Sequence, residues 1–403
     1  MNCTADEDAG GGIPTALADG PMLTSRIIFL FSLTCALAVA NVYSVQPLLD
    51  SIAVSLNVSP GITGSIVTVT QAGYALGLIF LVPLGDRFDR KTLVITHLIL
   101  SVLALAAAAL AQDLTMLLCA MLLIGLMAVV VQLVVAWSAM LAAPRQRGQV
   151  VGTVTSGIVL GILLARFISG AIADIAGWRA VYLTSACLML LVSFFLAKMM
   201  PATARRVSGS SYFSLLLSVF HLFITEPQLR KRGALAMLIF AAFSMLWTSM
   251  VMPLSALSLS HTGIGLFGLA GVAGALAASR AGVWADRGRG QRASGLALAL
   301  LTVSWLPIAF LDASLWWLVA GVIILDFAVQ TVHVINQSMI IAARPEAASR
   351  LVGAYMCFYS AGSAAGAIAA TQLYAQWGWQ SVCYAGAFVS ACAFIFWFGS
   401  RQS

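Results

Sequence analysis

Long apolar runs, broken at short intervals by charged or helix-breaking residues, constrain the fold of this chain more than any other feature. Apolar residues make up 61% of the 403 residues and charged residues only 9%, whereas soluble domains carry about 25% charged residues. Each run approaches the roughly 20 residues that a helix needs to cross a bilayer. We therefore expect an all-α membrane protein. Twelve spans are predicted near residues 27–49, 62–84, 92–111, 114–142, 149–173, 179–199, 233–257, 263–285, 293–311, 315–342, 351–374 and 380–399.

The positions of the basic residues predict the orientation of these spans. With the amino terminus inside, all of the 21 Lys and Arg residues except Arg166 and Arg179 fall on or near one face. Lys and Arg concentrate in cytoplasmic loops. We therefore expect a multi-pass membrane protein with both termini in the cytoplasm.

The chain divides into four predicted regions. Residues 1–24 are rich in Gly, Ala and Asp and predict a disordered cytoplasmic tail. Residues 25–200 and 233–403 each hold six spans. The linker 201–232 is the longest polar interruption, and Ser211–Phe223 within it predicts a short amphipathic helix on the inner membrane surface.

The two halves repeat with a nearly constant offset. The GDR sequence at Gly85–Arg87 returns as ADR at Ala285–Arg287, 200 residues later, and the GW pair at Gly177 returns at Gly378, 201 residues later. Such landmarks indicate two pseudo-symmetric six-helix bundles. Many secondary transporters rock two such repeats about a site near the bilayer midplane.

Several other functional classes lack support. The net charge is +7, but the basic residues lie in short turns rather than on a soluble face, so nucleic acid is not an expected partner. The seven cysteines form no CxxC pair and the four histidines no HExxH spacing, so no metal or other cofactor is expected. No GxxxxGK[ST] loop, GxSxG motif or paired membrane carboxylates occur, so neither ATP hydrolysis nor an intramembrane enzyme is expected.

The loop after the second span resembles a known family signature. Leu84–Lys91 (LGDRFDRK) resembles the G-x-L-a-D-r-x-G-r-k loop of the major facilitator superfamily, although Val82 and Asp89 replace its glycines, and Gly282–Gly290 is a partial second copy. The resemblance implies transport by alternating access and a loop that latches the halves in one state; a loop that only fixes orientation is the alternative. The implied gating residues are Gly85, Asp86, Arg87, Arg90, Lys91, Asp286 and Arg287.

The fifth span is similar to a glycine pattern, G-x8-G-x3-G-P-x2-G-G, of the antiporter members of this superfamily. Ala165 and Ser169 replace two of its glycines and Arg166 its proline, and Met121 stands where drug antiporters often have an Arg. The resemblance implies a twelve-helix drug:proton antiporter, with plain helix packing as an equal alternative for the glycines. The residues concerned are Gly152, Gly161, Gly170, Gly353, Gly362 and Gly366.

Asp326 is the strongest candidate for a functional group inside the membrane. It lies roughly 16 Å from the nearer end of its predicted helix, at 1.5 Å per residue, where a charge costs about 2.5–3.5 kcal/mol on insertion scales. Gln330, His333 and Gln337 follow at i+4, i+7 and i+11, so all four share one face that is not expected to meet lipid. We interpret Asp326 as a proton carrier or cation ligand; a structural acid bonded to another helix is the alternative.

Arg166 is the second charge predicted inside the membrane. Counting along the two helices separates it from Asp326 by about 10 Å in depth. This count leaves open both an ion pair between them and a guanidinium that reaches outward to the membrane surface. His333 could share a proton with Asp326, or be a hydrogen-bonding core histidine. The predicted proton-coupling residues are therefore Asp326, Arg166 and His333.

Neutral polar and aromatic residues on the other spans predict the lining of a central cavity. A mostly neutral cavity with aromatic groups and one acid suits an amphipathic or weakly cationic substrate. Ordinary helix packing is the alternative for each residue. The predicted substrate-binding residues are Asn41, Tyr43, Gln46, Gln71, Tyr74, Gln132, Trp247, Gln330, Gln337, Tyr355 and Tyr359.

Together these features and the family resemblance imply a secondary transporter of the inner (plasma) membrane, expected as a monomer, that couples efflux of drug-like or metabolite compounds to protons. Its expected partners are a small-molecule substrate, protons and the lipid bilayer. Proton-coupled uptake of a sugar or organic acid is an alternative, because the fold permits either direction. A membrane sensor that no longer transports is another.

Overall fold

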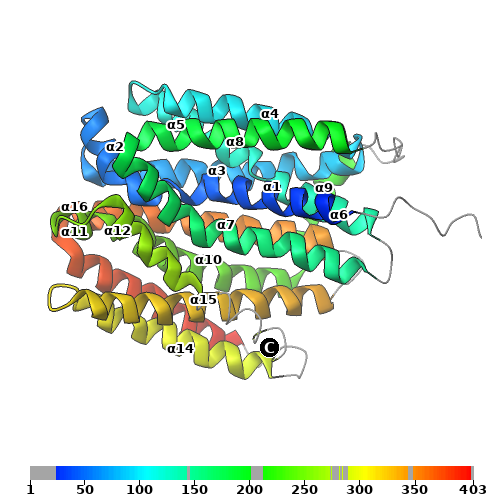
Figure 1. Ribbon diagram of the computed structural model, residues 1–403. Helices are drawn as coiled ribbons and strands as arrows, with labels where there is room; N and C mark the ends of the chain where they lie inside the picture. Colours follow the sequence, from blue (N-terminus) through cyan, green and yellow to red (C-terminus); the bar gives the residue numbers. More distant parts are fainter. Residues whose placement is uncertain are drawn as a thin grey trace, which may run out of the picture.

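The computed structural model describes residues 24–142, 146–200, 212–272, 289–343 and 348–400, together with Gly274, Ala281 and Trp284. Every regular element in these residues is a helix. Figure 1 shows the helices running roughly side by side, with the blue-to-green N-terminal half above the yellow-to-red C-terminal half. The N-terminal elements are α1 (Ser25–Tyr43), η2 (Gln46–Leu48), α2 (Leu49–Leu56), η3 (Pro60–Ile62), α3 (Gly64–Phe80), η4 (Val82–Asp86), α4 (Arg90–Ala109), α5 (Leu114–Met127), α6 (Val130–Leu141), α7 (Arg147–Ala176) and α8 (Trp178–Met199).

The C-terminal half follows a short connecting helix. The elements are α9 (Tyr212–Thr225), α10 (Pro227–Ser249), α11 (Val251–Ala256), α12 (His261–Leu266), η5 (Phe267–Gly271), α14 (Gly290–Ala309), α15 (Leu315–Ala343) and α16 (Ala348–Ser400). Ten described segments are long and apolar enough to cross a membrane, and the last, Arg350–Ser400, contains two helices that meet at Gly378. The predicted span 263–285 is described only in part. The all-α membrane fold predicted from the apolar runs is confirmed.

The internal repeat is visible in the backbone. The described residues include four with positive φ, which form two pairs: Asn57 (53°) with Ser258 (61°), and Gly177 (78°) with Gly378 (75°). The members of each pair are 201 residues apart, the offset read from the sequence. Positive φ is uncommon outside glycine, so its recurrence at Asn57 and Ser258 indicates that both halves turn in the same way at equivalent points.

The same offset relates helix contacts within the halves. Gly161 of α7 touches the backbone of Ala36 in α1, and Gly362 of α16 touches the backbone of Met237 in α10. Both members of the second contact lie 201 residues after those of the first. A Cβ at either glycine would collide with a backbone carbonyl. Small residues therefore permit these close approaches.

The other glycines of the predicted pattern behave in two ways. Gly170 and Gly366 also lie against the backbone of another helix, whereas a Cβ at Gly152 or Gly353 would meet open space. Gly152 and Gly353 are again 201 residues apart. The helix ends that carry them therefore make no close crossing at these positions.

The helix α9 covers most of the segment for which a surface helix is predicted. Phe213, Leu217, Phe220 and Ile224 are exposed on it, and their spacing places them on one side of the helix. An exposed apolar side suits a helix that lies on a membrane surface. The next helix, α10, begins at Pro227, which lies inside the segment 201–232 predicted as linker. A start at this residue is favourable, because proline is well tolerated in the first turn of a helix.

Candidate functional site

Arg166 of α7 lies in the interior between the two halves. Its side chain is only 2% exposed, and its Nε donates a hydrogen bond to Oε1 of Gln46 at 2.6 Å. The guanidinium carbon lies 3.7 Å from the ring centroid of Trp247 and 5.2 Å from that of Tyr43. The carbonyl of Gln46 and the aromatic faces partly replace the hydration that a buried cation loses. The guanidinium is thus held inside the molecule and does not reach outward.

Asp326 of α15 is hydrogen-bonded to the indole N–H of the same tryptophan. Its carboxyl group is 4% exposed, and Oδ1 accepts a hydrogen bond from the indole Nε1 of Trp247 at 3.1 Å. No nitrogen of Arg166 forms an ion pair with Asp326 within 4.0 Å among the described contacts. Trp247 therefore connects the two charges, through its N–H to the acid and through its ring to the cation.

This arrangement sets an acid and a cation against the same indole ring. A buried guanidinium is costly unless nearby charge or dipoles compensate it. Protonation of Asp326 would remove the nearest described negative charge and leave Arg166 with Gln46 and the aromatic rings. One nitrogen of the guanidinium, Nη2 of Arg166, has no hydrogen-bond partner among the described residues. This nitrogen is therefore a buried donor without a described acceptor.

The space beside Arg166 is small in this conformation. A cavity of about 10 Å³ is bounded there by Gln46, Trp247 and Ile264 together with their neighbours. A cavity of this size holds about one water molecule. Nothing larger than a water molecule therefore fits beside the guanidinium in this conformation.

A second group of predicted residues forms an aromatic cluster between the halves. The hydroxyl groups of Tyr43 and Tyr359 are hydrogen-bonded across the interface. The ring of Phe240 lies 4.2 Å from that of Tyr359 and 5.0 Å from that of His333, between centroids. Nδ1 of His333 is 3.0 Å from the hydroxyl of Tyr355. His333 thus makes its described contacts with aromatic residues and not with Asp326.

Neutral polar side chains of the N-terminal half lie next to this cluster. Gln132 donates a hydrogen bond to the hydroxyl of Tyr74 at 3.4 Å, and the ring of Tyr74 meets that of Tyr359 edge-on at 6.5 Å. Gln71 is 4% exposed and its Oε1 has no partner among the described residues. Asn41 is also buried, with an exposed fraction of 4%.

The predicted polar stripe of α15 faces other helices. Gln330 lies against Gly274, and Nε2 of Gln337 is 3.8 Å from the sulfur of Met356 in α16. Together with the contacts of Asp326 and His333, these place the stripe inside the molecule. The two glutamines make no described contact with Arg166, so the structure does not bring them into the charged centre.

The predicted gating loop is described in part. Nζ of Lys91 donates a hydrogen bond to the carbonyl of Met200, and the side chain of Asp89 caps α4 by accepting from the backbone N–H of Thr92 at 2.8 Å. A Cβ at Gly85 would lie 2.9 Å from Leu133. Arg87 is exposed and Arg90 partly buried. The side chain of Asp86, and Asp286 and Arg287, lie outside the described residues.

Two crossings between the halves close the end of the molecule that carries α2, α11 and α12, which we call the closed end (left in Figure 1). At the polar crossing, Asp174 of α7 accepts hydrogen bonds from the backbone N–H groups of His261 at 2.9 Å and Thr262 at 2.8 Å. The side chains also meet the carboxylate, Nδ1 of His261 at 2.8 Å and Oγ1 of Thr262 at 2.5 Å. An acid of one half thus caps a helix of the other.

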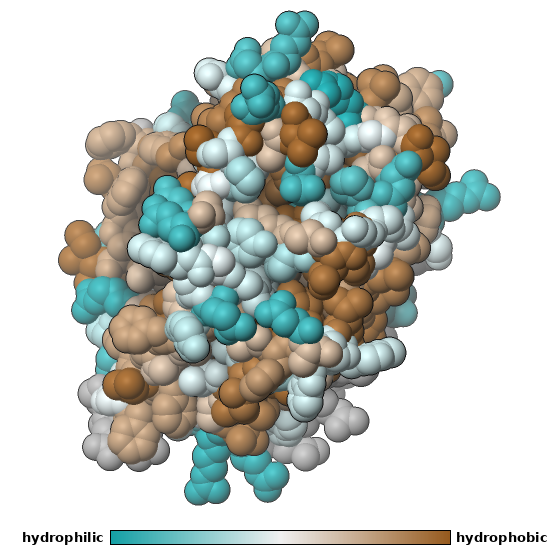
Figure 2. Space-filling model, turned by 90° about the vertical axis from the view of Figure 1, so that its left-hand side faces the viewer, coloured by the Kyte–Doolittle hydropathy of each residue, from teal (hydrophilic) through white to brown (hydrophobic). Residues whose placement is uncertain are grey.

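The small-residue crossing joins α16 to η3 and α3. Oγ1 of Thr371 donates a hydrogen bond to the carbonyl of Gly61 at 3.1 Å, and a Cβ at Gly61 would lie 3.1 Å from that of Ala375. Gly64 approaches the carbonyl of Ala367 so closely that a Cβ would collide with it. Figure 2 looks onto the closed end, where polar and near-neutral side chains (teal to white) fill the middle of the face.

Several contacting residues were not among the sequence predictions. Phe240 and Phe243 belong to the aromatic surroundings of His333 and Arg166, but within an apolar span nothing distinguishes them from ordinary core residues. Asp174 and His261 could have been suspected, since each is an ionisable residue close to the end of a span. Their pairing depends on the tertiary fold and has no signal in one sequence.

The described residues offer no metal centre. No group of three or more His, Cys, Asp and Glu side chains is placed to hold an ion, and the six described cysteines are unpaired.

Comparisons with known proteins agree with this architecture. The family model of the Major Facilitator Superfamily matches residues 31–278 and 232–403. The uncharacterized transporter YgaY of Escherichia coli O157:H7 is 42% identical over 377 residues, which are 93% of this chain and 95% of that protein.

Two solved structures are similar in fold. A bacterial homologue of the human lysosomal transporter Spinster, inward-facing and occupied, has a TM-score of 0.77 at 13% identity, and covers 94% of this chain and 97% of its own. The nucleoside transporter NupG has a TM-score of 0.75 at 14% identity, and covers 92% and 99%. With the family match and the close relative, these findings show that the chain belongs to the major facilitator superfamily of membrane transporters.

Proposed function

We propose that this transporter couples export of a drug-like or metabolite compound to proton entry, with Asp326 as the proton carrier. The observation that carries the proposal is the buried carboxyl group of Asp326. It accepts a hydrogen bond from Trp247, and the ring of the same tryptophan stacks on the guanidinium of Arg166. Ionisable groups deep in a membrane protein commonly mark ion or proton pathways. We further propose that the protein acts as a monomer in the inner membrane. We also propose that both termini lie in the cytoplasm, because the basic loops lie on one side.

In this orientation the closed end faces away from the cytoplasm. A weakly cationic substrate would enter from the cytoplasmic side and displace the proton from Asp326. The aromatic cluster of Tyr43, Phe240 and Tyr359 would hold its apolar part. Competition between proton and substrate for one carboxylate is what exchange requires, since each then leaves on the side where the other binds.

The test is proton flux in proteoliposomes that carry a pH gradient, with a lipophilic cationic dye as substrate. Addition of the dye should release protons in the wild type, and Asp326→Asn should bring the release down to that of empty vesicles. Asp312→Asn is the matched control, because it removes an exposed carboxylate and should leave coupling unchanged. Dye movement without protons in the wild type, or normal coupling in Asp326→Asn, would refute the role of Asp326.

One observation favours proton-coupled uptake of an organic acid as a second candidate. The free Nη2 of Arg166 is a buried donor on a cation, and such a group suits a carboxylate. An anion would bind best when Asp326 is protonated, so proton and substrate would move together rather than in exchange. An aromatic acid added outside the same vesicles distinguishes the two: proton entry with the acid supports uptake, and proton release by the dye alone supports export.

A further inference from the structure

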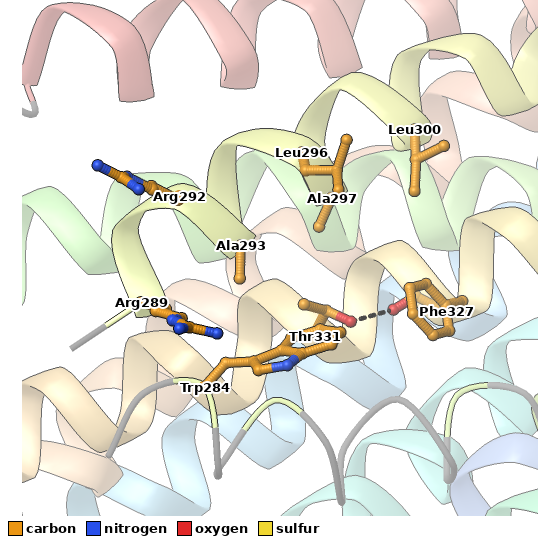
Figure 3. A pocket seen from close by; sticks show the side chains of 9 residues that line it. All are labelled: Trp284, Arg289, Arg292, Ala293, Leu296, Ala297, Leu300, Phe327 and Thr331. Atoms are coloured by element: carbon orange, nitrogen blue, oxygen red, sulfur yellow. Dashed lines mark hydrogen bonds between the residues drawn. The ribbon is translucent and has the colours of Figure 1, made fainter. Parts of the chain in front are cut away.

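A groove on the side of the C-terminal half lies apart from the charged centre. It runs between α14 and α15, has a volume of about 310 Å³, and is bounded at one end by Trp284. Figure 3 shows Arg289 and Arg292 toward one end of the groove, and Leu300 and Phe327 toward the other. The groove therefore has a cationic end and an apolar length.

The cationic end carries two exposed arginines. Neither guanidinium, of Arg289 or of Arg292, makes a hydrogen bond or ion pair with another described residue, and both side chains are exposed. The first turn of α14 holds no acidic residue, and no side chain caps its N-terminus. The backbone dipole there favours an anion. In Figure 3 the side chain of Arg289 points toward Trp284 and that of Arg292 points the other way, so the positive charge is spread over both sides of this helix end.

The rest of the groove offers little to a polar ligand. Leu296, Leu300 and Phe327 supply apolar surface, and Leu296 is 66% exposed. The hydroxyl of Thr331 is engaged with the carbonyl of Phe327 at 2.8 Å, the dashed line in Figure 3. A soluble anion such as phosphate would use the arginines but leave this apolar surface uncovered. A hydrocarbon chain would cover it.

We propose that the groove binds an anionic phospholipid, with its phosphate at Arg289 and Arg292 and one acyl chain along Leu296, Leu300 and Phe327. Basic pockets between membrane helices suit such headgroups. The volume is at the lower end of the roughly 300–1,000 Å³ of ligand pockets, enough for part of one chain. Trp284 lies beside the headgroup position, where tryptophan is favoured at membrane interfaces. That the lipid belongs to the cytoplasmic leaflet rests on the proposed orientation; binding itself does not.

The test is native mass spectrometry of the full-length protein in detergent with phosphatidylglycerol and phosphatidylcholine of identical chains. The wild type should bind the first lipid about ten to thirty times more tightly, as expected for two interfacial arginines. Arg289→Gln/Arg292→Gln should abolish the preference, and Arg87→Gln/Arg350→Gln, which removes two exposed arginines elsewhere, should keep it. Ala293→Trp, which fills the groove but retains both arginines, should weaken binding of both lipids.

Three results would overturn the proposal. They are equal binding of the two lipids by the wild type, a preference that survives Arg289→Gln/Arg292→Gln, and displacement of phosphatidylglycerol by millimolar inorganic phosphate, which would indicate a site for a free anion. Each variant is first compared with the wild type by gel filtration and circular dichroism, so that lost binding is not lost folding. Because lipid binding is measured without transport, its failure is independent of the proton-coupling proposal.

Discussion

The two crossings at the closed end are equivalent in backbone and different in chemistry. At the small-residue crossing Gly64 meets Ala367, and at the polar crossing Gly265 meets Arg166. Gly265 lies 201 residues after Gly64, and Arg166 lies 201 residues before Ala367. Both glycines touch the backbone of the opposite half. The same offset relates Ala375 to Asp174. One crossing is thus closed by a carboxylate and the other by a methyl group, on the same scaffold.

The difference follows from the donors available on the facing helix. Asp174 accepts from the backbone N–H groups of His261 and Thr262, whereas the residue equivalent to His261 is Pro60, which has no N–H to donate. Position 375 is exposed, and a carboxylate there would find fewer backbone donors on the facing segment than Asp174 does. Duplicated backbones therefore share their close contacts, while each polar contact depends on what both partners supply.

The largest expected effect tests the shared part of the comparison. Gly64→Ala and Gly265→Ala should each open the closed end, because the new Cβ would collide with a backbone carbonyl that cannot turn aside. Overpacking of this kind costs typically about 1–3 kcal/mol, enough to shift the closed-to-open ratio by about fivefold to about 150-fold. The measurement is the distance distribution between spin labels at Val54 and Leu257, exposed residues of opposite halves, in a cysteine-free background.

Gly152→Ala and Gly353→Ala are the matched controls for this pair. They are equivalent glycines that face open space, and alanine is intrinsically the better helix former by about 0.5–1 kcal/mol. Neither control should lengthen the distance between the labels. If Gly64→Ala opens the end and Gly265→Ala does not, the two crossings are not mechanically equivalent and the comparison breaks down.

The next effect tests the polar crossing alone. Asp174→Ala removes the acceptor of two backbone and two side-chain contacts. The carboxylate and His261 are partly exposed, so water can accept hydrogen bonds from some of the donors that lose their partner. We expect a cost of about 1.5 kcal/mol, less than hydrogen bonds to a fully buried charge would give. The same spin labels should report an open fraction about tenfold larger.

Asp113→Ala separates this effect from loss of any helix cap. Asp113 accepts from the backbone N–H of Met116 within its own half, so its removal weakens α5 without touching the other half. The label distance should stay as in the wild type. Equal opening by Asp113→Ala and Asp174→Ala would show that the acid at the crossing has no specific role.

The sequence predicts the fold better than it predicts these contacts. Apolar runs and the GDR and GW landmarks suffice for an all-α repeat, since span length and turn residues are local properties. The helical face on which Asp326 lies also follows from local spacing along the chain, and the polar stripe on that face does lie in the interior of the molecule. The contact of Trp247 with both charges is not local. Counting residues along straight helices separates Arg166 from Asp326 in depth, but α7 runs obliquely to its neighbours in Figure 1, and a bulky indole joins the two groups laterally.

The smallest expected effect tests the small-residue crossing. Thr371→Val keeps the shape of the side chain but removes the hydrogen bond to the carbonyl of Gly61. The same hydroxyl also lies 3.3 Å from the carbonyl of Ala367 in its own helix, so the net cost should be about 0.5–1 kcal/mol. The spin labels should show an open fraction no more than about fivefold above the wild type. A larger opening would mean that this crossing, too, depends on a polar contact.

Combining Thr371→Val with Asp174→Ala then asks whether the crossings act on one equilibrium. If both variants shift the same two-state opening and share no contact partner, their free energies should add within about 0.5 kcal/mol. A sum that falls short by more than this would indicate that one crossing is already open once the other is broken. In that case the halves separate in sequence, beginning at the polar crossing. The two contacts are then equivalent in their static geometry but not in their energetics.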